Sequence, residues 1–122
     1  MDNQYHAVQS RFSAFGSEIL KLVDLLKKAG IPASVIDQLV RSGTGVGANY
    51  AEARGAESPA DFLHKLQLAL KECREAKHWL EVLRGTEEVP RRSVTTLLKE
   101  SDEFCAILYS SLVTAKQRRN SS

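Results

Sequence analysis

The sequence has 122 residues, of which 43% are hydrophobic and 26% are charged, and this is the balance of a single globular domain that can bury its own core. Its apolar runs are too short to span a membrane, and its N-terminus, MDNQYHAVQ, lacks the basic-then-apolar order of a signal peptide, so we expect a cytoplasmic protein with two reduced cysteines. A formal net charge of +2 is too small to predict nucleic-acid binding by itself.

The first half of the chain predicts two helices, because apolar residues recur there at steps of three and four. The first helix is expected over residues 3–29, with Lys27 and Lys28 in its last turn, Gly30 just past its end and Pro32 beyond. The same spacing continues over residues 33–55, which predicts the second helix.

The second half predicts two more helices. Ser58 is a candidate N-cap with Pro59 at the first helical position, and Gly85 ends a helix over residues 59–84. The fourth helix is expected over residues 91–116, before a basic tail at 116–122. Because the connections are short and no segment alternates with the period of a strand, we expect one all-α domain over residues 1–122, an up-down-up-down antiparallel four-helix bundle.

Residues 41–55, RSGTGVGANYAEARG, place four glycines inside the second helix. They fit neither the dinucleotide-binding nor the P-loop spacing, and no strand precedes them, so a phosphate-binding loop is not expected. Small residues four apart favour the close approach of another helix, which would offset the low helix propensity of glycine. A kink or hinge at the glycines is the alternative. The candidate packing residues are Gly43, Gly47, Ala51, Gly55 and Trp79.

The third helix is apolar around more than half of its circumference. Leu63 and Leu70 lie on one flank of its apolar seam, and Leu68 and Trp79 lie on the other. We therefore expect self-association, unless this helix is simply more buried within its own bundle.

Catalytic or metal chemistry is not predicted. Glu75 and His78 have the spacing of one di-iron ligand pair, but the second pair that this chemistry needs is missing. Cys73 and Cys105 lie on apolar seams, which favours small core residues over ligands or a disulfide. We expect no enzyme activity, no cofactor, no metal and no small-molecule substrate.

Two stretches, LVRSGTGVGANYAEA and FLHKLQLALKECREAKHWLEVL, together resemble a bacterial family of four-helix bundles, the 23S rRNA intervening-sequence proteins, over roughly residues 10–115. The resemblance implies a homopentameric ring, and a similarity to the accessory variability proteins of diversity-generating retroelements, which bind a reverse transcriptase and nucleic acid. For most members no biochemical function is established. The family's polar signature falls on Arg41, Ser42, Asn49, Glu52, Lys65, Glu72 and Glu75, and the resemblance implies polar bonding between helices or subunits for these residues. The chain departs from the family at Ala53, where many members have glycine, and in its low net charge.

Two functions compete at this stage. The first is a non-enzymatic oligomeric scaffold that binds itself, as a pentamer, and RNA or an RNA-associated protein. The alternative is a nucleic-acid-binding accessory protein that acts through basic surface patches. The candidate nucleic-acid-binding residues are Lys27, Lys28, Arg91, Arg92, Lys116, Arg118 and Arg119.

Overall fold

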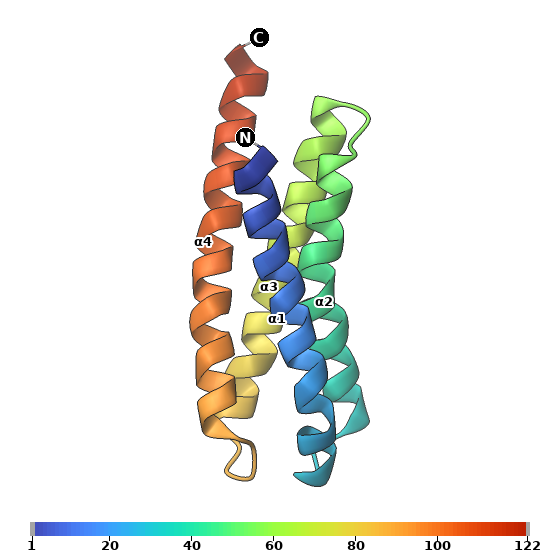
Figure 1. The fold of residues 1–122 in the computed structure, drawn as a ribbon, viewed down its shortest axis with the longest axis vertical. Helices are drawn as coiled ribbons and strands as arrows, with labels where there is room; N and C mark the ends of the chain where they lie inside the picture. Colours follow the sequence, from blue (N-terminus) through green and yellow to red (C-terminus); the bar gives the residue numbers. More distant parts are fainter. Residues whose placement is uncertain (1, 122) are drawn as a thin grey trace.

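The computed structural model describes residues 2–121, and these form four helices joined by short loops. The helices are α1 (Asp2–Lys28), α2 (Ala33–Arg54), α3 (Pro59–Arg84) and α4 (Arg91–Ser121). Each runs antiparallel to the next, so both termini lie at the same end of the bundle as the α2–α3 loop (Figure 1). The described residues contain no strand, and the predicted all-α, four-helix fold is confirmed.

The helix ends follow the local signals in the sequence. Gly30 adopts a positive φ of 81°, a conformation that favours glycine, just after α1. The Ser58 side chain accepts a hydrogen bond of 3.0 Å from the Asp61 backbone N–H, which caps α3. The basic tail differs from the prediction, because α4 continues as a helix to Ser121.

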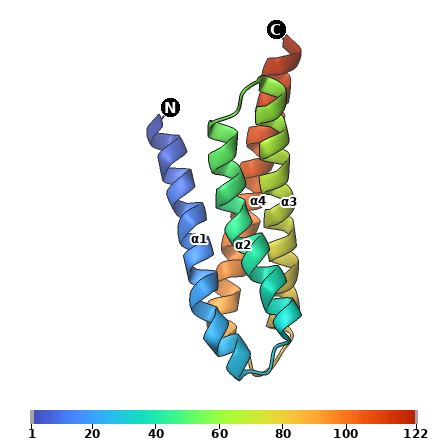
Figure 2. The same cartoon turned by 90° about the vertical axis from the view of Figure 1, so that its right-hand side faces the viewer.

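The core is apolar along the whole length of the bundle, and aromatic rings fill the space between α1 and α4. Phe12 and Phe15 of α1 both meet Phe104 of α4 edge-to-face, with centroid distances of 4.9 and 5.4 Å. All three rings are buried. The rings keep the backbones of α1 and α4 further apart than those of the other neighbouring helices, and α1 leans away from α3 and α4 toward its N-terminus (Figure 2).

Small residues bring α1 and α2 close together. A Cβ added at Gly47 would lie 3.5 Å from the backbone carbon of Phe12, and one at Gly16 would lie 3.5 Å from the Cα of Thr44. A Cβ at Gly43 would overlap the side chain of Ile19, which is fully buried. Gly43 and Gly47 therefore lie against α1 of the same chain, and α2 runs without interruption from Ala33 to Arg54.

Gly55 does not belong to this packing stripe. It is the C-cap of α2, it is exposed, and a Cβ there would meet only the Glu52 carbonyl oxygen at 3.8 Å. Ala51 is also exposed and lies at the edge of the groove between α1 and α2. The spacing of four residues predicted that Gly43, Gly47, Ala51 and Gly55 share one helix face. However, α2 ends at Arg54, one residue before Gly55.

Candidate functional site

Six of the seven signature residues lie along the line where α2 and α3 meet. We call this set the α2–α3 ladder; its members are Arg41, Asn49 and Glu52 of α2, and Lys65, Glu72 and Glu75 of α3. Since the two helices are antiparallel and joined by a short loop, residues of α2 near the loop face residues of α3 near it, and distant ones face distant ones. Five of its six members carry a charge.

Ion pairs link the two sides of the α2–α3 ladder near its ends. Arg41 Nη2 lies 3.6 Å from Glu75 Oε1, and Lys65 Nζ lies 3.6 Å from Glu52 Oε2. The Arg41 and Glu52 side chains are 65% and 61% exposed, so solvent screens both pairs and each contributes little to stability.

Glu72 occupies the middle of the α2–α3 ladder, opposite Gly45. A Cβ at Gly45 would lie 3.0 Å from Glu72 Oε2, so glycine makes room for this carboxylate. Burial raises the pKa of the Glu72 carboxyl, and the nearby carboxylate of Glu75 raises it further. Glu72 Oε2 is shielded from solvent and has no hydrogen-bond partner among the described residues, and the same holds for Trp79 Nε1, seven residues further along α3.

Two signature residues bond within their own helix. The Ser42 hydroxyl is buried and donates to the Gln38 carbonyl oxygen at 2.8 Å, and the Asn49 amide donates to the Gly45 carbonyl oxygen at 2.8 Å. The interhelical role that the resemblance implied for them is therefore not seen within this chain. Ser42 serves as a small, internally satisfied core residue.

The structure divides the predicted basic residues between the two ends of the bundle. Lys27 and Lys28 end α1, and Arg91 and Arg92 begin α4, so these four lie at the end that carries the α1–α2 and α3–α4 loops. Lys116, Arg118 and Arg119 lie in the last turns of α4, at the opposite end. The seven residues are therefore not one continuous basic surface.

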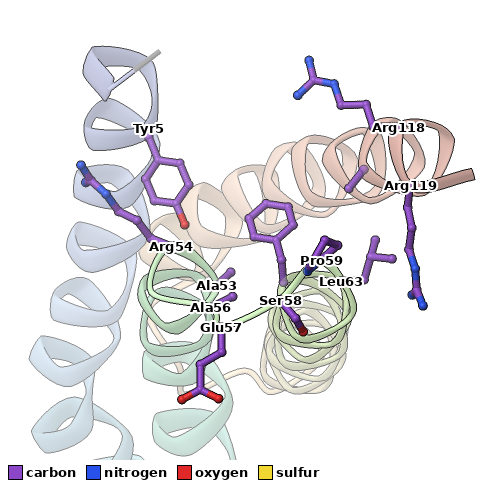
Figure 3. A pocket seen from close by; sticks show the side chains of 12 residues that line it. Tyr5, Ala53, Arg54, Ala56, Glu57, Ser58, Pro59, Leu63, Arg118 and Arg119 are labelled. Atoms are coloured by element: carbon purple, nitrogen blue, oxygen red, sulfur yellow. The ribbon is translucent and has the colours of Figure 1, made fainter. Parts of the chain in front are cut away.

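A pocket of about 750 Å³ opens at the end that carries the termini. Apolar side chains, among them Phe62 and Leu63, form its inner wall, and Figure 3 shows Arg54, Arg118 and Arg119 around its rim. Arg54 also lies over the Tyr5 ring, 5.0 Å from its centroid, and the Tyr5 hydroxyl donates to the Tyr50 carbonyl oxygen at 2.7 Å. Sequence reasoning missed this pocket because it is assembled from all four helices and the α2–α3 loop.

A second hollow, which we call the α1–α2 groove, runs along the outer surface where the glycines bring these helices together. It has a volume of about 380 Å³ and a mainly apolar lining of small residues. Ala48 and Ala51 are exposed along one side, and Leu20 stands at its edge with 53% of its surface exposed.

Among the described side chains, those of residues 4–121, no three of His, Cys, Asp or Glu are grouped closely enough to hold a metal ion. Over the same residues, no helix has the length and apolar character needed to cross a membrane.

Comparisons with known proteins agree with this architecture. The model of a family described as 23S rRNA-intervening sequence protein matches residues 6–110. A crystal structure of a protein of unknown function from the S23 ribosomal protein family of Bacteroides thetaiotaomicron is similar, with a TM-score of 0.80 and 36% sequence identity. The similarity covers 86% of this chain and 97% of the other. No curated protein sequence matches.

Proposed function

The chain belongs to the 23S rRNA-intervening sequence protein family, and from this premise we propose that it is a non-catalytic scaffold whose activity is to assemble with copies of itself. The observation that carries the proposal is the α1–α2 groove, an exposed apolar hollow lined by small residues. Small residues at a helix surface let an incoming chain approach the backbone closely. The occupant we infer is a second copy of this chain.

Tyr109 of α4 is the side chain that we assign to the groove of the neighbouring copy. It is 56% exposed, the largest exposed fraction among the big apolar side chains of the described residues. Its helix is not one of the two that form the groove, so the contact would join two different surfaces. Such head-to-tail contacts form a ring when their rotation closes, and a ring of five copies agrees with what the family resemblance implies.

The test is the solution mass of the full chain, measured by light scattering after removal of nucleic acid. The wild type should show one discrete mass above that of a monomer, near five chains. Ala48→Arg in the groove and Tyr109→Ser on α4 should each shift the protein toward monomer while the helical circular dichroism stays unchanged. Ala14→Arg is the matched control, because Ala14 is exposed on α1 but does not line the groove. A monomeric wild type, or variants with the wild-type mass, would contradict the proposal.

Direct nucleic-acid binding is the second candidate function. It is favoured by the topology that brings Lys27, Lys28, Arg91 and Arg92 to one end of the bundle. Repetition of this end around a ring would add avidity to weak single contacts. Filter binding to single-stranded RNA should weaken steeply with salt, and more so for the wild type than for Lys27→Ala/Lys28→Ala. Lys21→Ala is the control, since Lys21 pairs with Glu18 at 3.2 Å. Absent or salt-independent binding would contradict this function.

A further inference from the structure

Two cysteines from adjacent helices lie in contact at the α3–α4 interface. Cys73 Sγ of α3 and Cys105 Sγ of α4 are 3.2 Å apart, and both thiols are free. A disulfide requires about 2.05 Å between the sulfurs, so a shift of roughly 1 Å would join them. The sequence favoured small core residues over ligands or a disulfide, whereas the structure brings the two sulfurs into contact.

The two thiols differ in their access to solvent. Cys73 is fully buried, and its sulfur lies 3.5 Å from the Ser101 carbonyl oxygen. Cys105 is only half-buried and reaches the surface between α3 and α4. A reagent from solvent therefore meets Cys105 first, and Cys73 can react only with what has formed on Cys105.

Electrostatics favour an ionised Cys105. When Cys105 loses its proton, the Cys73 thiol can donate a hydrogen bond to the thiolate, which lowers the pKa of Cys105, and the positive charges of Lys77 and Arg74 lower it as well. Burial and the carboxylate of Asp102 act in the opposite direction, although Asp102 is itself paired with Lys77 at 2.6 Å. The same hydrogen bond, with burial, raises the pKa of Cys73, which therefore stays protonated as the donor.

We propose that Cys105 and Cys73 form an oxidisable dithiol site that reacts with hydroperoxides, Cys105 as the attacking thiolate and Cys73 as the resolving thiol. In the first step the Cys105 sulfur attacks one peroxide oxygen and the O–O bond breaks. Cys105 is oxidised to a sulfenic acid, and the leaving hydroxide or alkoxide takes a proton to give water or an alcohol.

In the second step the Cys73 sulfur attacks the Cys105 sulfur, and the S–O bond breaks. The hydroxyl group leaves with the thiol proton of Cys73 as water. The sum is two thiols and one hydroperoxide converted to one disulfide, water and a second water or alcohol, so the two electrons lost by the sulfurs reduce the peroxide. The product joins α3 covalently to α4.

The experiment uses the reduced full chain and hydrogen peroxide, with intact-mass and peptide mass spectrometry under non-reducing conditions. The wild type should lose two hydrogen atoms and yield one peptide pair that contains Cys73 and Cys105. Cys73→Ala should stop at a sulfenic acid on Cys105, which dimedone traps. Cys105→Ala should leave Cys73 unmodified, because Cys73 is buried. Alanine is small enough to keep either variant folded, and circular dichroism checks this.

The rate supplies an independent test. At neutral pH the folded protein should react faster than the same chain in denaturant, because the lowered pKa of Cys105 leaves more of it as the reactive thiolate. The proposal would be overturned by any of three results. These are disulfides that form only between chains, over-oxidation of Cys105 without the internal disulfide, and oxidation of Cys73 in Cys105→Ala to the same extent as in the wild type.

Discussion

Alanine substitutions at Gly43 and Gly47 should change the stability of the protein in opposite directions. Both glycines are buried in the interior of α2 and face α1. A Cβ at Gly47 would lie 3.4 Å from Gln9 Nε2 and 3.5 Å from the backbone carbon of Phe12, which is ordinary contact. A Cβ at Gly43 would overlap Ile19 Cδ1, and Ile19 is fully buried.

The magnitudes follow from two opposing effects. Alanine in place of glycine within a helix stabilises by about 1 kcal/mol, and Gly47→Ala should retain most of this gain. At Gly43 the Ile19 side chain must leave its rotamer inside a packed core, which costs about 1–3 kcal/mol. Gly43→Ala should therefore be destabilised by about 1 kcal/mol, so that the two variants differ by roughly 2 kcal/mol.

The assay is urea unfolding followed by far-ultraviolet circular dichroism, at one protein concentration because self-association would make the free energy of unfolding depend on it. Gly55→Ala is the control and should change little, since its Cβ would meet only one carbonyl oxygen at 3.8 Å. If Gly43→Ala is as stable as Gly47→Ala, the close packing of α2 against Ile19 is refuted.

Two further predictions concern carboxylates and pH. Burial, and after it repulsion from Glu75, raises the pKa of Glu72 in the folded state. Protonated Glu72 therefore adds to the stability of the fold at acid pH, and this stabilisation is lost as pH rises through the raised pKa. Glu72→Gln should therefore be more stable than the wild type by about 1 kcal/mol at neutral pH, with the gain vanishing in acid; an equal gain at all pH values would contradict this. For Glu103 the sign is reversed, because the hydrogen bond from Arg11 (2.7 and 3.0 Å) lowers its pKa. The stability that ionised Glu103 contributes is present above the usual carboxyl pKa and is lost as pH falls through the lowered pKa. Thermal unfolding at neutral pH and low salt should therefore show that Glu103→Gln is less stable than the wild type. At strongly acid pH the two proteins should be equally stable.

The sequence predicted the helices well because their signals are local. Spacing of apolar residues, the Ser58–Pro59 cap and the glycines at positions 30 and 85 each act within one turn of helix. The end of α4 was predicted too early because KQRRNSS contains no apolar residue, and the periodic signal therefore stops although the backbone hydrogen bonding continues.

Contacts between helices were predictable only in part. The resemblance implied polar bonding for Arg41, Glu52, Lys65 and Glu75, and the structure pairs Arg41 with Glu75 and Lys65 with Glu52. Neither pair is symmetric about the loop between α2 and α3, since Glu52 lies two residues before the end of α2 and Lys65 lies six residues after the start of α3. Cys73 and Cys105 face each other across a longer connection between α3 and α4. A shift of one residue along either helix would rotate a thiol by about 100°, so spacing alone could not pair them.

The side-chain sizes on the two sides of α1 explain where the exposed apolar surface lies. Phenylalanines separate α1 from α4, whereas Gly16 and Gly47 let α1 approach α2. Close approach leaves only small side chains to cover that side, so the α1–α2 groove exposes surface near the backbone. The packing that closes the monomer core thus creates the hollow that we assign to a second copy. The groove can nevertheless be altered without disturbing the core, because Ala48 is exposed while its neighbour Gly47 is buried. Loss of assembly in Ala48→Arg with normal unfolding would show that the two roles belong to neighbouring residues of one helix.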